Sequence, residues 1–158
     1  MKKYRIHIMA KIEIGDIFEI NTPKGKIYLH YIYKDERIGE LIRVLPGVYL
    51  EKPDLLNLAA KKEVYMVFFP LAAAKKRKIV EQVGHFPAND FSKPKYMRSK
   101  HIVRGEFLGW HIVDTDTFHM RLVKSLAPEQ LQLSPWGVAN DAFLVDNVIN
   151  DWTLEKWS

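Results

Sequence analysis

Residues 14–45 constrain the fold most, because they hold three apolar runs separated by residues that favour turns. Thr22-Pro23-Lys24-Gly25 has the composition of a type I turn, in which proline presets φ and glycine tolerates the positive φ that follows. The second run, residues 27–33, is β-branched and aromatic, and the polar residues 35–37 separate it from a third run at 41–45. The pattern predicts a meander of three strands.

The second of these strands is apolar on both sides. Side chains alternate between the two faces of a strand, so each face can be read directly from the sequence. A strand with two apolar faces is typical of the centre of a sheet, and both of its faces must be covered. One face holds Ile27, Leu29, Tyr31 and Tyr33, and the other holds Tyr28, His30 and Ile32.

The rest of the chain supplies further strands and two short helices. We expect an edge strand at 4–8, a helix at 53–60, a central strand at 64–69, a short surface helix at 71–79, a strand at 80–86, a loop at 87–94, and strands at 101–104, 106–113 and 118–123. Near the end, apolar residues recur at helical spacing and predict an amphipathic helix that covers the sheet. These residues are Val138, Ala142, Val145, Ile149 and Trp152.

These elements predict one α+β domain spanning residues 1–158. Its sheet should be strongly bent and mostly antiparallel, with an SH3-like barrel as one arrangement for the first half, and the C-terminal helix should cover it. The chain has no cysteine, no signal-peptide core and no run near the roughly 20 apolar residues that span a bilayer. We therefore expect a cytoplasmic protein that has no membrane partner.

The charge is unevenly distributed. The net charge is +5, and residues 125–158 hold one lysine against five acids, which leaves 23 Lys/Arg and 14 Asp/Glu in residues 1–124. A basic surface suits an acidic protein or a nucleic acid. The cations that we expect to contact an acidic partner are Lys75, Lys76, Arg77, Lys78, Arg98 and Lys100.

Candidate catalytic and metal-binding residues are present, but their spacing matches no known site. The cluster that comes nearest to a metal site consists of His101, His111, Asp114, Asp116 and His119, and it lacks any His-x-His or His-Glu-x-x-His spacing. No serine lies in a Gly-x-Ser-x-Gly elbow, and the eight glycines form no phosphate-binding loop. We predict no enzymatic activity, no cofactor and no bound metal.

Five segments in order resemble the bacterial immunity protein 26 family. They are 14–18 (Ile-Gly-Asp-Ile-Phe), 64–69, 83–87 (Val-Gly-His-Phe-Pro), 94–96 (Pro-Lys-Tyr) and 110–114 (Trp-His-Ile-Val-Asp), and the similarity runs from about Lys11 to the C-terminus. The resemblance implies an immunity protein that binds a cognate bacterial toxin stoichiometrically and occludes its active site without turnover. We expect the motif residues Gly15, Asp16 and Trp110 to be structural, with Trp110 on the face of Leu108 and Ile112 under the terminal helix.

Two alternatives remain open. A nucleic-acid-binding module would use the basic run at 75–78 together with the strand tyrosines Tyr28, Tyr31 and Tyr33. The chain contains no recognised Arg/Lys-plus-aromatic motif, which makes nucleic acid the less favoured partner. A small hydrolase is the least supported function.

Overall fold

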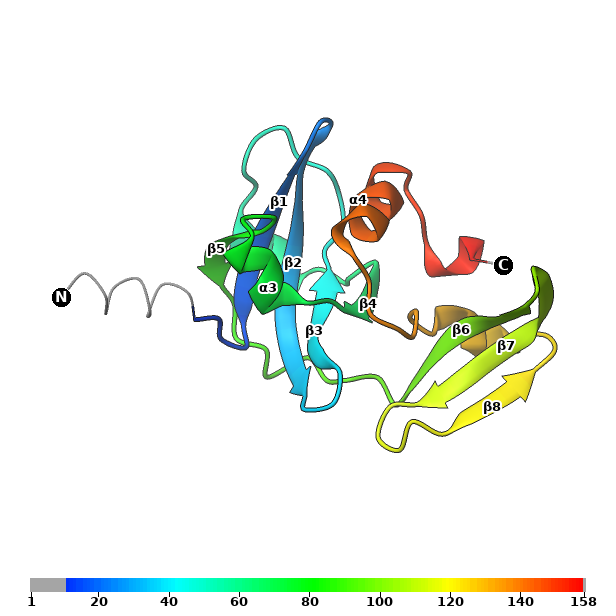
Figure 1. The fold of residues 1–158 in the computed structure, drawn as a ribbon. Helices are drawn as coiled ribbons and strands as arrows, with labels where there is room; N and C mark the ends of the chain where they lie inside the picture. The colour runs from blue at the N-terminus through cyan, green and yellow to red at the C-terminus, as the bar shows by residue number, and fades with distance from the viewer. Residues whose placement is uncertain (1–10, 158) are drawn as a thin grey trace.

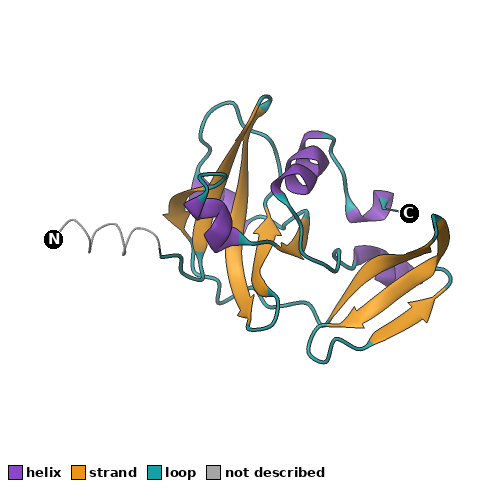
Figure 2. Cartoon of the chain, viewed as in Figure 1, coloured by secondary structure: helices purple, strands orange, loops and turns teal. Residues whose placement is uncertain are grey.

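The structure is a computed structural model that describes residues 11–157, and it is α+β with two antiparallel sheets (Figures 1 and 2). The edge strand expected at 4–8 lies outside the described residues. The five-stranded sheet has the order β4-β3-β2-β1-β5, and the three-stranded sheet has the order β6-β7-β8. The strands are β1 (Asp16–Thr22), β2 (Gly25–Asp35), β3 (Gly39–Val44), β4 (Tyr65–Phe68), β5 (Glu81–His85), β6 (Tyr96–Val103), β7 (Glu106–Asp114) and β8 (Met120–Val123).

The helices are short and cover the sheets. They are α2 (Leu55–Ala60), α3 (Leu71–Lys76), α4 (Asp141–Ile149) and the 3-10 turns η1 (Pro128–Gln132) and η2 (Leu154–Lys156). Asp54 caps α2 by accepting from the backbone N–H groups of Leu56 and Asn57, and Asn140 caps α4 by accepting from Phe143. No helix among residues 11–157 is long and apolar enough to span a membrane.

The predicted meander is confirmed. At the turn between β1 and β2, the Thr22 hydroxyl donates to the carbonyl of Gly25 over 2.6 Å, and Gly25 has a φ of +138°. β2 lies at the centre of the five-stranded sheet, as its two apolar faces predict. One face, with Leu29 and Tyr31, packs under α3, α4 and η2, and the other, with Tyr28 and Ile32, is also buried.

The α+β class and the antiparallel pairing are as expected, but two details of the sheet differ from what the sequence suggested. The five-stranded sheet stays open, with β4 and β5 as its edges, so no closed barrel forms among residues 11–157. The segment expected to be a central strand, 64–69, contains the edge strand β4. It is apolar throughout because residues beyond the sheet cover its outer side: Phe68 pairs with Val138 in a parallel bridge and accepts a hydrogen bond from Ala139.

The single bent sheet that we expected is instead two sheets joined by residues 134–139. Ser134 accepts a hydrogen bond from each sheet: its Oγ accepts from the Met66 N–H of β4, and its carbonyl accepts from the Arg98 N–H of β6. Met97 of β6 packs into the same core cluster as Ile32 and Phe68 of the larger sheet. The two sheets therefore share buried apolar contacts as well as this connecting segment.

The C-terminal helix is present but differs from the sequence expectation. α4 has nine residues and covers one face of the five-stranded sheet (Figure 1). Its buried residues are Leu144 and Val148, whereas Val138 is 58% exposed and Ala142 is exposed. The helix begins only after its N-cap Asn140, so Val138 belongs to the extended connecting segment, whereas Val145 and Trp152 do pack against the core as predicted.

A buried polar network fixes the protonation state of His30. Its Nε2 lies 2.7 Å from the carbonyl oxygen of Phe86, and its Nδ1 lies 2.9 Å from a guanidinium nitrogen of Arg43. A carbonyl can only accept and a guanidinium can only donate, so the ring must be neutral with its proton on Nε2. Arg43 is fully buried, pairs with Glu63 over 2.8 Å, and lies 3.7 Å from the ring centroid of Phe91.

This network makes the stability dependent on pH. Burial lowers the pKa of His30 from 6.5 to about 4, so the unfolded chain takes up a proton in this interval and the folded protein does not. Its contribution to stability is therefore complete above about pH 6.5 and is lost as the pH falls towards 4. We expect the free energy of unfolding to fall by up to about 3 kcal/mol over this interval because of His30 alone.

Urea unfolding at pH 7, 5.5 and 4 of wild type and of His30→Gln isolates this contribution, because the other titrating groups are common to both. The variant should be less stable at pH 7, and the gap between the two proteins should narrow as the pH falls. If the difference in the free energy of unfolding between the two proteins stays constant from pH 7 to pH 4, His30 has the same pKa in the folded and unfolded states, and the network described is contradicted.

Candidate partner-binding surface on the three-stranded sheet

The three-stranded sheet ends in a tight hairpin between β6 and β7. Arg104 and Gly105 have φ values of +50° and +80°, as the two central residues of a type I′ turn require. The register shifts between His101 and Ile102, because His101 pairs with Gly109 and Ile102 pairs with Phe107, which leaves Leu108 as an extra residue. The sheet extends away from the five-stranded sheet in Figure 1, so its hairpin end projects from the molecule.

Exposed apolar side chains concentrate on this sheet. Among residues 11–157, more than half of the large apolar side chains that are exposed lie on β6, β7 and β8. Phe107 and its partner Ile102 share a face with Trp110, whereas Leu122, opposite His111, lies on the other face. The exposed set consists of Tyr96, Ile102, Val103, Phe107, Leu108, Met120 and Leu122.

Cations surround these apolar residues. Arg104, Arg121 and Lys124 are exposed, and Lys100 is half-buried with its Nζ 6.0 Å from the ring centroid of Phe107. Glu106 is the neighbouring carboxylate at the hairpin. β8 is the outer strand of this sheet and pairs with β7 alone among the described strands. We call this region, β6–β8 with its exposed apolar side chains and these cations, the hairpin surface.

Arg98, which we expected at a partner surface, is instead fully buried. Its guanidinium lies 4.5 Å from the rings of both Trp110 and Trp157, and burial lowers its pKa to about 10. Four backbone carbonyls accept hydrogen bonds from it, those of Leu131 (3.2 Å), Leu133 (3.1 Å), Leu154 (2.8 Å) and Trp157 (3.0 Å). Its role is therefore to hold the C-terminal residues against the sheet, and no partner can reach it.

Trp110 is buried, as expected, but its neighbours differ from the expectation. It is 4% exposed and packs edge-on against Trp157, with ring centroids 5.0 Å apart. Leu108, expected on the same buried face, is 41% exposed because the irregular pairing at the hairpin displaces it. The residues that cover Trp110 come from the segment after α4 and not from the helix itself.

The basic run at 75–78 lies at the other end of the molecule from Lys100. Lys75 and Lys76 end α3, Arg77 and Lys78 follow it, and α3 lies beside β1 and β5, remote from the three-stranded sheet (Figure 1). The six cations that we grouped from the sequence therefore form no single surface. One is buried, one belongs to the hairpin surface, and four lie near β5.

Gly15 and Asp16 have the structural positions that we expected. Gly15 has a φ of +107°, and the buried carboxylate of Asp16 accepts from the backbone N–H of Glu13 over 2.8 Å. Asp16 also has a second partner that the sequence did not indicate, His85, whose Nδ1 lies 2.9 Å from Oδ1 of Asp16. Asp16 of β1 and His85 of β5 are 69 residues apart in the chain, and only the pairing of these two strands brings them together.

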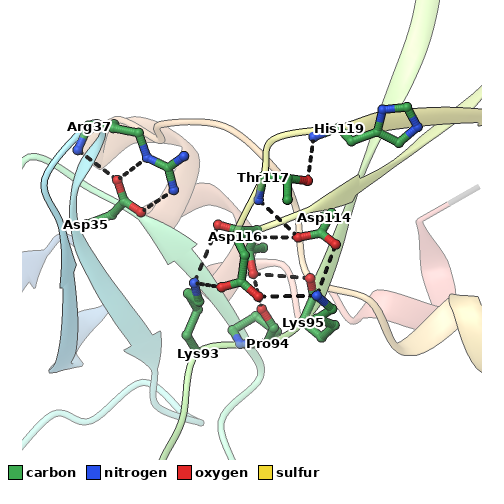
Figure 3. Close-up of polar contacts among 10 residues, drawn as sticks. Asp35, Arg37, Lys93, Pro94, Lys95, Asp114, Asp116, Thr117 and His119 are labelled. Atoms are coloured by element: carbon green, nitrogen blue, oxygen red, sulfur yellow. Dashed lines mark hydrogen bonds and ion pairs between the residues drawn. The ribbon is translucent and has the colours of Figure 1, made fainter.

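The residues considered as a metal site do not form one. Among residues 11–157, no group of three or more His, Cys, Asp or Glu side chains is arranged to hold an ion. Asp114 and Asp116 pair instead with Lys95 and Lys93, and Asp114 also accepts from the backbone of the turn (Figure 3). Lys95 and these backbone donors lower the pKa of Asp114 to about 2.

Two tyrosines of the proposed nucleic-acid platform are buried. Tyr28 is fully buried and donates from its hydroxyl to Glu19 over 2.8 Å, and Tyr31 is 4% exposed. Neither ring can stack on a base, so of its three tyrosines the alternative keeps only Tyr33, which is half-buried.

Comparisons of the chain with protein-family models, with curated proteins and with solved structures find no match. The resemblance to the immunity protein 26 family stays a prediction.

We expect Trp110→Ala to lower the free energy of unfolding by about 3–5 kcal/mol, because it removes a large buried ring from between Arg98 and Trp157. Phe107→Ala is the matched control: its ring is 5.7 Å from Trp110 but 46% exposed, and the loss should stay below about 1 kcal/mol. Denaturant unfolding measures both. Equal losses for the two variants would contradict the assignment of Trp110 as the anchor of this region.

Proposed function

We propose that this chain is an immunity protein that binds and neutralises a cognate bacterial toxin by stoichiometric occlusion, without turnover of its own. The observation that carries the proposal is the hairpin surface, where exposed apolar side chains gather beside four cations. Solvent-exposed apolar groups in this concentration are typical of protein-binding sites. The sequence resemblance supplies the kind of partner.

The shape of the hairpin surface suits occlusion. Phe107 and Leu122 lie on opposite faces of a sheet that projects from the molecule, so both faces offer apolar contacts to a surrounding partner. A projecting element with two apolar faces can enter a cleft, and an active site is commonly the cleft of an enzyme. Burial of about 1,200–2,000 Å² in total would be needed for a stable complex.

The charges indicate an acidic partner. The hairpin surface has one neighbouring carboxylate, Glu106, and four cations, Lys100, Arg104, Arg121 and Lys124. The whole chain has a net charge of +5. Opposite charge on the partner would accelerate association, and the apolar contacts would set the rate of dissociation. Because a free toxin molecule turns over many targets, we expect nanomolar affinity, about −12 kcal/mol.

We expect co-expression with the toxin encoded beside this gene to rescue growth, and the two proteins to purify as a complex. Phe107→Ser combined with Leu122→Ser should weaken the complex by at least tenfold, because both exposed contacts are lost. Leu56→Ser is the matched control, since Leu56 is 58% exposed on α2, outside the hairpin surface. The purified protein alone should hydrolyse no ester, phosphoester or nucleic acid.

If the Phe107→Ser/Leu122→Ser variant rescues growth and binds the toxin with wild-type affinity, the hairpin surface is not the binding site. If the purified protein hydrolyses a substrate and a single His or Asp substitution abolishes that turnover, the immunity function is excluded.

Charge reversal tests which cations face the partner. Arg104→Glu with Arg121→Glu should slow association, whereas Lys76→Glu with Arg77→Glu, on exposed residues beside β5, should leave the rate nearly unchanged. Surface plasmon resonance at two salt concentrations measures both rates. The opposite ranking would move the partner site to the basic run.

A further inference from the structure

A second candidate site lies beside β5, at the opposite end of the molecule from the hairpin surface. It is a cleft of about 1000 Å³ that opens between β1, β5 and the end of α3. Its lining includes an imidazole, three lysines and a buried carboxylate, those of His85, Lys11, Lys75, Lys78 and Asp16. Nothing in the proposed immunity function uses this cleft.

The imidazole of His85 is held in one orientation. Asp16 is 3% exposed, its Oδ2 accepts from Glu13 N–H over 2.8 Å, and its Oδ1 lies 2.9 Å from Nδ1 of His85. A carboxylate only accepts, so the proton of a neutral His85 is on Nδ1 and the other ring nitrogen, Nε2, is left for a ligand. The side chain of His85 is 48% exposed, so a ligand can reach it.

Gly15 provides the space for this ring. A Cβ at position 15 would lie 2.5 Å from Cε1 and 2.8 Å from Nε2 of His85, and the φ of +107° excludes most other residues as well. The imidazole therefore lies directly against the backbone of Gly15. The Gly-Asp pair at the start of β1 both positions His85 and selects the nitrogen that it offers.

Lys78 occupies a position where glycine would be more stable. α3 ends in a Schellman motif: Lys78 N–H donates to Lys75 O over 3.0 Å, and Ile79 N–H donates to Ala74 O over 2.9 Å. Lys78 follows the C-cap residue Arg77 and has a φ of +62°. Glycine usually fills this position of the motif. The chain keeps a lysine here at a cost in stability, and its side chain lines the cleft.

The donors in the cleft suit a phosphoryl group. Ammonium groups and an imidazole are separate point donors that come from three different segments, and a phosphoryl group offers several oxygens that can meet them individually. A protonated imidazole donates from Nε2, and a neutral one accepts from a P–OH group. The charge of Asp16 is already engaged by His85, so it opposes an anion less than an exposed carboxylate would.

The cleft is also lined by hydrogen-bond acceptors, those of Glu13, Glu81 and Gln82, which suit a ligand that carries hydroxyl groups besides its phosphoryl group. Carboxylates repel a phosphoryl group but accept hydrogen bonds from hydroxyls. We propose that the cleft binds a small hydroxylated phosphomonoester, with its phosphoryl group on His85, Lys75 and Lys78 and its hydroxyls towards Glu13 and Glu81. This proposal does not depend on the immunity function, because the hairpin surface is remote from it.

The test uses the full chain with inorganic phosphate and with ribose 5-phosphate, at constant ionic strength, followed by NMR of the histidine side chains. We expect saturable shifts of His85 with millimolar affinity for phosphate, tighter binding of ribose 5-phosphate, and no saturable shift with acetate or ribose. Lys78→Gly should weaken binding about tenfold and raise Tm by a few degrees, because glycine relieves the positive φ. His85→Gln, followed through the backbone amides of β5 because the reporting imidazole is absent, should abolish saturable binding.

Lys52→Ala, which removes an exposed cation outside the cleft, is the matched control and should bind phosphate like wild type. Absence of a saturable shift, equal weakening in Lys52→Ala and Lys78→Gly, or full affinity in a folded Lys78→Gly would each overturn the proposal. Because Lys78→Gly is expected to be more stable than wild type, loss of binding in it cannot be attributed to unfolding.

Discussion

The burial of Arg98 is the interaction on which the arrangement of the second half of the chain depends. Its guanidinium has no carboxylate partner within hydrogen-bonding distance among the described residues, and its charge is balanced by four backbone carbonyls and two tryptophan rings. A buried cation is costly unless its donors are satisfied. The carbonyls come from two irregular segments that would otherwise need other partners, so the arginine and these segments stabilise each other.

Arg43 has the same role in the first half of the chain. It too is fully buried, and it donates to the carbonyls of Ala59 and Lys61 at the C-terminal end of α2 while pairing with Glu63 and His30. Each sheet thus has one buried arginine that fixes irregular backbone against it. The difference lies in the counter-charge, because Arg43 pairs directly with Glu63, whereas the groups in contact with Arg98 are carbonyl dipoles and aromatic faces, and the charge of Glu155 acts on it from farther away.

Local pattern predicted the meander and the α+β class well. The alternation in β2 and the chemistry at Thr22–Gly25 are contained in neighbouring residues, so no distant contact was needed to interpret them. The same reasoning failed for Arg98, because a charged residue is read as exposed, and its acceptors lie 33–59 residues further along the chain. It failed for β4 in the same way, since the residues that cover this edge strand follow it by about seventy positions.

In the candidate sites too, features that follow from residue type could be predicted, and features that depend on distant contacts could not. The burial of Trp110 and the special backbone of Gly15 could be predicted from residue type, but the neighbours of Trp110 and the pairing of Asp16 with His85 could not. The hairpin surface was missed because apolar residues on strands are expected to be inside, and no local signal distinguishes an exposed Phe107 from a buried one. Its exposure results from the three-stranded sheet having a free end.

The long separation between Arg98 and its acceptors sets an order of folding during synthesis. All five strands of the larger sheet are complete at His85, whereas the last carbonyl that binds Arg98 belongs to Trp157. At about 5–20 residues per second, the ribosome adds the intervening chain only seconds after the arginine itself. Until then the three-stranded sheet has neither its arginine clamp nor the cover over Trp110, so it is the part of a nascent chain that depends most on protection from aggregation.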